Sequence, residues 1–338
     1  MSSFKILRLL TILASVLLLF SNIYAQSGLV LRDSIIIGGK AKWDYLSIDP
    51  EGRRLYSSHG DEVDVIELNS KKIIAQIPAH GSHGIAFSRD AGHGFITNGK
   101  ANTVTVFDLS NNQIIKETKV GNDPDAITFD SKTGRVFAFN GHGSSASVLD
   151  AQSGDLVGTI DLKGSPEFGV TDGNGFVFVN LEDKNETLEI DAKKMKVIHR
   201  WSLKSGDAPT GLSIDIKNRI LFIGCHNMQM IVMNAANGNI EKVLPIGKGV
   251  DATAFDPMHM QAFSSNGDGT LTIIDEKSKS SFEVSENLHT LIGGRTMAID
   301  MTTQDIYIAS ADVQLPLPAS DKKPSFIDGT FKIYKYTR

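Results

Sequence analysis

One short phrase returns along this 338-residue chain at intervals of about forty residues, a period typical of proteins built from stacked or circular repeats. Its clearest copy reads GFITNG at 94–99 and continues, after a turn, as VTVFDL at 104–109. The copies consist of short apolar runs separated by turn residues, and none has the spacing of an amphipathic helix. A unit of this length cannot bury its apolar side chains alone, so neighbouring copies have to pack against each other.

The first copy indicates what one repeat contains. Four of its stretches have the composition of strands: 46–48, 54–56, 63–68 and 73–77. Four antiparallel strands of this size form one blade of a β-propeller. The first strands of successive repeats are expected to begin near Trp43, Ser82, Pro124, Pro166, Pro209, Val250 and Gly294. The sequence therefore predicts an all-β, seven-bladed β-propeller of four-stranded antiparallel blades.

The last repeat departs from the others in two ways. The chain stops after its third strand, at 330–336, whereas 31–37 has the apolar pattern that ends the other repeats. We expect this N-terminal strand to complete the last blade and to remove the open edge of the ring. The second departure is an insertion at 310–329, which is either a surface loop or a lid or docking segment over one mouth of the channel.

The first 25 residues have the features of a secretory signal peptide. Lys5 and Arg8 precede an uncharged apolar run at 9–20, and Ala25 is a small residue suited to cleavage. The run is short for a membrane span, although an uncleaved anchor remains the alternative. We therefore expect one propeller domain over 26–338 and a periplasmic or secreted protein, with no transmembrane segment once the signal is removed.

Composition limits the classes of partner. The chain carries 34 basic and 39 acidic residues, a formal net charge of −5, which does not favour nucleic acid or an anionic surface. The single cysteine, Cys225, cannot form an internal disulfide, so packing has to supply the stability. We expect the protein to act as a monomer.

The repeat phrase also resembles that of a known family. Phe95, Ile96, Thr97 and Asn98 are similar to the Tyr-Val-Thr-Asn phrase of the YVTN-repeat propellers, and 178–180 gives a partial second copy. On this basis the chain resembles the YncE-like exported seven-bladed propellers. The resemblance implies an architecture and leaves the activity open, because propellers host unrelated functions. It also implies single-stranded DNA binding, which the acidic composition does not support.

The repeat register gathers polar residues at one mouth of the channel, because the first strand of each blade lines the channel. The residues just ahead of or at the start of these strands are Asp44, His83, Asp125, Glu167, Thr210, Asp251 and Arg295. Six of the seven can carry charge, which indicates a ligand-binding ring. The competing interpretation is that each of them makes a local hydrogen bond to a neighbouring blade.

A second layer of polar residues comes from the loops after the second strands. The candidates there are His59, His142, His226 and Asn266, which are expected on the same face as the ring. Asparagine and glycine at such positions are also ordinary turn residues.

Three functions are consistent with this arrangement. The preferred one is a non-catalytic exported propeller that binds a small polar ligand or a protein partner at its charged mouth. The alternative is a metal-dependent enzyme of the lyase or lactonase type, with catalytic residues not identified beyond His83 or Glu167 as general acid or base. Its divalent metal, zinc, manganese, iron or copper, would be held by His59, His83, Asp44 and Glu167. The third function is the DNA binding implied by the family resemblance.

Overall fold

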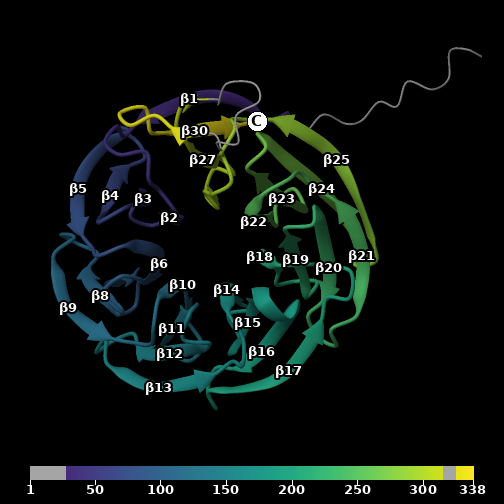
Figure 1. Ribbon diagram of the computed structural model, residues 1–338, viewed down its shortest axis with the longest axis horizontal. Coiled ribbons are helices and arrows are strands. Elements are labelled where there is room, and N and C mark those ends of the chain that lie inside the picture. The colour runs from purple at the N-terminus through teal and green to yellow at the C-terminus, as the bar shows by residue number, and fades with distance from the viewer. Residues whose placement is uncertain (1–27, 315–324) are drawn as a thin grey trace, which may run out of the picture.

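The computed structural model describes residues 28–314 and 325–338, so the predicted signal peptide lies outside the described residues. The chain forms seven four-stranded antiparallel sheets arranged around a central axis (Figure 1). The predicted seven-bladed β-propeller is therefore confirmed. The only helical turn in the described part of the chain is η1 (Glu182–Lys184). Within those same residues, no helix is long and apolar enough to cross a membrane.

The first three blades follow one another in the order of the sequence. Blade 1 consists of β2 (Leu46–Asp49), β3 (Arg54–His59), β4 (Glu62–Glu67) and β5 (Lys72–Pro78). Blade 2 consists of β6 (Ser82–Ser88), β7 (His93–Asn98), β8 (Thr103–Asp108) and β9 (Ile114–Lys119). Blade 3 consists of β10 (Pro124–Asp130), β11 (Arg135–Asn140), β12 (Ser145–Asp150) and β13 (Leu156–Asp161).

The next three blades continue the same order. Blade 4 consists of β14 (Pro166–Thr171), β15 (Phe176–Leu181), β16 (Glu186–Asp191) and β17 (Lys196–Ser202). Blade 5 consists of β18 (Pro209–Asp215), β19 (Ile220–Cys225), β20 (Gln229–Asn234) and β21 (Ile240–Pro245). Blade 6 consists of β22 (Val250–Asp256), β23 (Gln261–Asn266), β24 (Thr270–Ser278) and β25 (Ser281–His289).

Blade 7 combines both ends of the described chain. Its strand order is β26 (Met297–Ile299), β27 (Ile306–Ser310), β30 (Lys332–Thr337) and β1 (Val30–Ile36). The N-terminal strand β1 pairs antiparallel with β30, so the predicted closure of the ring is confirmed. The insertion contributes a small hairpin of β28 (Val313–Gln314) and β29 (Ser325–Phe326), and the rest of it, 315–324, lies outside the described residues.

Burial explains why the middle strands of each blade are apolar throughout. Five of the six residues of β7 are buried, as are five of the six of β8, because both faces of these strands pack against neighbouring blades. The outer strand β9 has no buried residue. Large side chains such as Phe95, Phe137 and Phe222 fill the space between blades.

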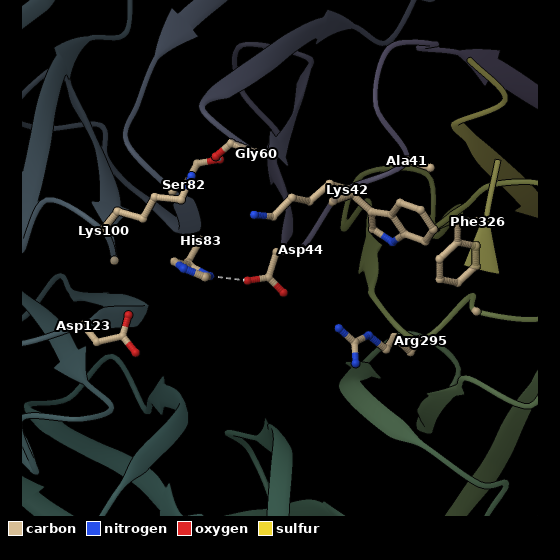
Figure 2. Close-up of a pocket in the computed structure, with 14 residues that line it drawn as sticks. Ala41, Lys42, Asp44, Gly60, Ser82, His83, Lys100, Asp123, Arg295 and Phe326 are labelled. Carbon is tan, nitrogen blue, oxygen red and sulfur yellow. Dashed lines mark hydrogen bonds and ion pairs between the residues drawn. The ribbon is translucent and has the colours of Figure 1, made fainter. Parts of the chain in front are cut away.

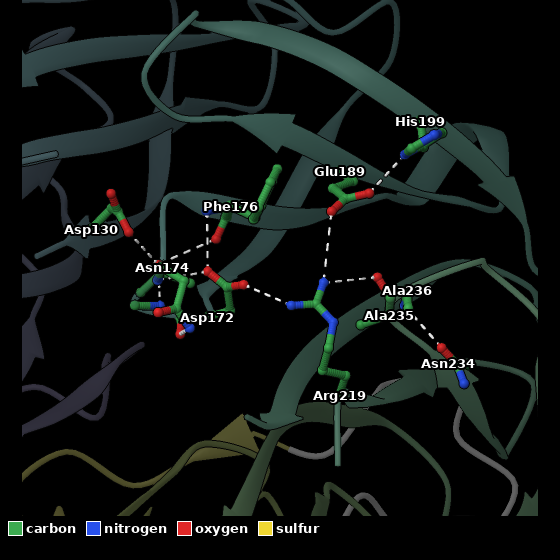
Figure 3. A network of polar contacts seen from close by, with 12 residues as sticks. Asp130, Asp172, Asn174, Phe176, Glu189, His199, Arg219, Asn234, Ala235 and Ala236 are labelled. Atoms are coloured by element: carbon green, nitrogen blue, oxygen red, sulfur yellow. Dashed lines mark hydrogen bonds and ion pairs between the residues drawn. The ribbon is translucent and has the colours of Figure 1, made fainter. Parts of the chain in front are cut away.

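We call the end of the channel where the inner strands begin the mouth, and the opposite end the far end. At the far end, most inner strands finish at a buried aspartate that a side chain of the next blade contacts. The contacts are Asp49 with Arg89, Asp130 with Thr171, Asp172 with Arg219, Asp256 with Arg338, and Asp300 with Arg53. Figure 3 shows the third of these, in which Arg219 Nη1 lies 3.0 Å from Asp172 Oδ2. These contacts join successive blades.

The junction between blades 5 and 6 differs from these five. Asp215, the last residue of β18, meets Glu276 of β24 in place of a cation or hydroxyl, and both residues are buried. Asp215 Oδ2 and Glu276 Oε2 have no donor among the described residues. Burial raises the pKa of Glu276 to about 7, and the charge of Asp215 adds to the shift, although Asn218 and Lys279 oppose it. Glu276 is therefore protonated below about neutral pH.

Closure by β1 generates a stability prediction with an internal control. Ile35 is 4% exposed in the core of blade 7, whereas its neighbour Ile36 is 71% exposed. We expect Ile35→Ala to lower the free energy of unfolding by about 2–4 kcal/mol, because it empties part of a packed core. We expect Ile36→Ala to change it by less than about 0.5 kcal/mol. Urea-induced unfolding measures both, and equal effects would contradict the closure.

The raised pKa of Glu276 generates a second prediction, on the pH dependence of stability. The pKa of a glutamate is near 4.5 in the unfolded chain, whereas that of Glu276 is about 7 in the fold. The contribution of Glu276 to stability is therefore complete below about pH 4.5 and is lost as the pH rises through about 7. Glu276→Gln keeps a hydrogen-bond donor and carries no charge. We expect this variant to exceed the wild type by about 1–3 kcal/mol in free energy of unfolding above about pH 8, and to match it under acidic conditions.

Urea unfolding at the two pH values measures this difference. Glu283→Gln, at an exposed position of the same hairpin, is the control and should follow the wild type at both. A wild type and a Glu276→Gln variant with the same pH dependence would contradict the raised pKa of Glu276.

Candidate functional site

The predicted ring residues share one position in the blades. Five of them are the second residue of an inner strand: His83, Asp125, Glu167, Thr210 and Asp251. Asp44 and Arg295 stand two residues before β2 and β26. In blades 2 to 6 the pairing with the second strand is irregular at this point. Such a bulge re-aims the side chain that it contains, away from the ladder.

Four ring residues are also held in place by the preceding blade. In each case a side chain next to the end of the second strand donates a hydrogen bond to the main-chain carbonyl of the ring residue. The pairs are Ser58 with His83, Thr97 with Asp125, Asn180 with Thr210, and Ser265 with Arg295. We call these contacts the inter-blade tethers. They give the main-chain carbonyls of these four ring residues a side-chain donor from the preceding blade.

Three ring side chains from successive blades meet at the mouth. His83 Nδ1 lies 2.5 Å from Asp44 Oδ2 and 3.5 Å from Asp125 Oδ1 (Figure 2 shows the first contact). Burial by itself lowers the pKa of His83, but the hydrogen bond to Asp44 and the charge of Asp125 outweigh it, so the pKa is raised. We call these three residues the mouth triad.

The ring positions carry more carboxyl groups than cations. Burial is the main cause that raises the pKa of Asp125 to about 7, of Asp251 to about 6 and of Glu167 to about 9, and neighbouring carboxylates add to each shift. Arg295 opposes the shift of Asp251, because its Nε lies 3.2 Å from Asp251 Oδ2. The channel therefore attracts protons or other cations.

Two aromatic residues lie directly after ring positions. Tyr45 of blade 1 and Phe168 of blade 4 approach to 4.8 Å between ring centroids, which joins inner strands from opposite sides of the ring. Burial and the charges of Asp125 and Asp44 raise the pKa of Tyr45 well above its usual value, so its hydroxyl stays neutral. The sequence analysis missed this pair, because both residues have the pattern of ordinary strand residues.

A cavity of about 630 Å³ opens at the mouth, between blades 1, 2 and 7. Its polar lining includes Lys42, Asp44, His83, Lys100, Asp123 and Arg295. Figure 2 shows Asp44 and His83 between Asp123 on one side and Arg295 and Phe326 on the other.

One wall of this cavity is aromatic. The ring centroid of Trp43 lies 4.7 Å from that of Phe326 in the insertion hairpin and 4.9 Å from that of Phe331. The described part of the insertion therefore lines the mouth. Neither Trp43 nor Phe326 stands at a ring position, which is why the repeat register did not select them.

The remaining predicted residues make contacts of their own. Glu167 is not part of the mouth triad, and Thr210 is buried and donates to the Val250 carbonyl at 3.1 Å. His142 Nδ1 lies 2.6 Å from Asp123 Oδ2, and His226 Nδ1 lies 3.8 Å from Glu182 Oε1. Both histidines are exposed beside the mouth.

His59 and Asn266 are engaged inside their own blades. His59 Nδ1 lies 2.8 Å from Asp64, and its Nε2 lies 2.7 Å from the Lys40 carbonyl. Asn266 is buried and donates its amide hydrogens to Thr270 and Thr272 of the next strand. Of the four residues expected to hold a metal, the structure brings Asp44 and His83 together, and it adds Asp125 to them.

The asparagine of the repeat phrase has a structural role. Asn98 and Asn140 end second strands, and each donates to two hydroxyl groups of the third strand in the same blade. Asn266 makes the same pair of contacts. In these three blades the asparagine therefore fixes the turn between the second and third strands, whereas Asn180 donates to main-chain carbonyls of the next blade.

Comparisons with known proteins show the fold alone. No model of a known protein family and no curated protein matches the sequence. Among solved structures, the chain is similar to the structure of U3-55K, a seven-bladed propeller of the WD40 type, with a TM-score of 0.73. The match covers 91% of this chain and 98% of that one at 8% sequence identity.

Proposed function

We propose that this protein is an exported propeller that binds a small polar ligand in the mouth cavity. The seven-bladed fold supports a binding or scaffold role in general. The cavity itself is the observation that carries the finer proposal, because about 630 Å³ falls within the range of small-molecule sites.

The lining suggests the chemistry of the ligand. Lys42 and Arg295 offer positive charge, and neither is buried. Asp44 and Asp123 offer acceptors across the cavity, and Trp43 offers an apolar face. Opposed charges of this kind suit a small molecule with a carboxylate at one end and hydroxyl or amino groups at the other.

Export is supported by the N-terminal sequence and by the YVTN-type phrase. We expect cleavage after Ala25, because the short apolar run behind Lys5 and Arg8 has the form of a signal peptide. The N-terminal sequence of protein recovered from the periplasm or medium of a bacterial host should begin at Gln26. Full-length protein retained in the membrane fraction would instead indicate an anchor.

A metal-dependent enzyme is the second candidate. The observation in its favour is the mouth triad, whose three donor atoms all lie within 4.8 Å of one another. In that case His83 would be a ligand of the metal, which leaves it no role as a general base.

The binding proposal is tested by calorimetric titration of the purified protein with sugar acids, amino acids and short dicarboxylates. We expect at least one of these classes to bind, and the double variant Lys42→Ala, Arg295→Gln to weaken that binding about tenfold or more, because it removes the charge that faces the carboxylate. Lys248→Ala removes an exposed lysine that does not line the cavity, and should leave the affinity unchanged.

Two results would count against the proposal. Affinity that the double variant does not alter would place the ligand elsewhere on the molecule. Failure of every probe at millimolar concentration would favour a protein partner at the mouth over a small ligand.

A further inference from the structure

The mouth triad brings three potential metal ligands together from three separate blades. Asp44, His83 and Asp125 each offer one donor atom, and these atoms lie within 4.8 Å of one another. Asp44 and His83 also line the mouth cavity (Figure 2). We propose that the mouth triad binds one divalent transition-metal ion through His83 Nδ1 and one carboxylate oxygen of each aspartate.

The backbone around these residues is fixed before any ion arrives. Ser58 and Thr97, two of the inter-blade tethers, hold the main chain of His83 and of Asp125. A side chain on Gly99 would come within 2.7 Å of His83 Nε2, so the imidazole lies in a space that only glycine leaves open. Ligands on strands that are held in this way give a metal site its geometry.

The charge balance around the mouth triad favours a dication. Asp125 Oδ1 is buried and accepts no hydrogen bond from the described residues, although His83 Nδ1 lies 3.5 Å away. The short contact of His83 Nδ1 goes to Asp44 Oδ2, at 2.5 Å. A divalent ion would lie beside both aspartates and would bind the Asp125 oxygen that accepts no hydrogen bond within the described part of the chain.

The donor set limits the choice of metal. One imidazole nitrogen with two carboxylate oxygens suits zinc, manganese or iron(II) better than calcium or magnesium, which prefer oxygen alone. Ligand atoms at about 2.0–2.2 Å from one ion lie roughly 3–3.5 Å apart, so the 2.5 Å contact between Asp44 and His83 has to open by under about 1 Å. Side-chain rotation of partly exposed residues can supply this change.

Three protein ligands leave coordination positions free on the side of the cavity. Such an open site is typical of a metal that binds water or a ligand, whereas closed structural sites use four protein ligands. In the mouth cavity, the free positions would face the space lined by Lys42 and Arg295. An anionic group of a ligand could then bind the ion directly.

A second group of possible donors in the described residues lacks these properties. His59, Glu62 and Asp64 also lie close together. His59 is buried, its Nε2 is occupied by the Lys40 carbonyl, and its ring packs 5.0 Å from Phe331. None of the three lines the cavity, so we assign the metal to the mouth triad alone.

Calorimetric titration of chelator-treated protein with Zn²⁺ and Mn²⁺ tests the proposal. We expect one ion per chain, and a loss of at least about 10-fold in affinity for His83→Ala, which removes a ligand, and for Asp125→Asn, which removes the charge of one. His199→Ala is the matched control, since His199 also pairs with a carboxylate, Glu189 at 2.7 Å, but lies on an outer strand. Its affinity should equal that of the wild type.

A measurement on the wild type keeps the test independent of folding defects in the variants. Addition of Co²⁺ should broaden the NMR signals of the His83 ring and leave those of His199 unchanged. The proposal is overturned if no ion binds, if His83→Ala binds as well as the wild type, or if Co²⁺ broadens other histidines first. The metal titration needs no organic ligand, so its outcome is separate from that of the small-ligand proposal.

Discussion

The hydrogen bonds that pass from one blade to the next are the constraint on which the rest of this structure depends. A propeller blade has no covalent link to its neighbour except one loop, and in blades 2 to 6 its inner strand begins with an irregular stretch of the ladder. Ser58, Thr97, Asn180 and Ser265 each donate a hydrogen bond to a main-chain carbonyl of the following blade. The same contacts that join the blades therefore also set the position of the ring side chains.

Both ends of the channel concentrate acidic groups, but they are compensated differently. At the far end, arginines such as Arg219 neutralise buried aspartates of the preceding blade. At the mouth, Asp125, Glu167 and Asp251 have raised pKa values because burial is not fully offset by His83 and Arg295. Groups held in this way are costly for folding alone, and such perturbed sites cluster where proteins bind or react.

The sequence predicted the architecture well because the repeat is a one-dimensional pattern. It assigned the blades, the ring positions and the closure by the N-terminal strand. It did not predict which ring residues meet, because that depends on how each bulge turns its side chain: Asp125 joins Asp44 and His83, whereas Glu167 does not. His59 and Asn266 were expected to be loop residues facing a ligand, but their side chains make hydrogen bonds within their own blades. The contact between Tyr45 and Phe168 was not predicted because it crosses the ring, and no local sequence pattern indicates which residues of distant blades meet.

The pairing of β1 with β30 has a consequence for the order in which this molecule is assembled. The two strands are separated by the other six blades in the sequence, so the ring stays open until residues 332–337 have been synthesised. The mouth cavity is lined by residues of blades 1 and 2 on one side and by Arg295 and Phe326 on the other. Its two sides are therefore joined only when the ring closes, and a chain truncated before β30 would carry most of the blades but an incomplete mouth cavity.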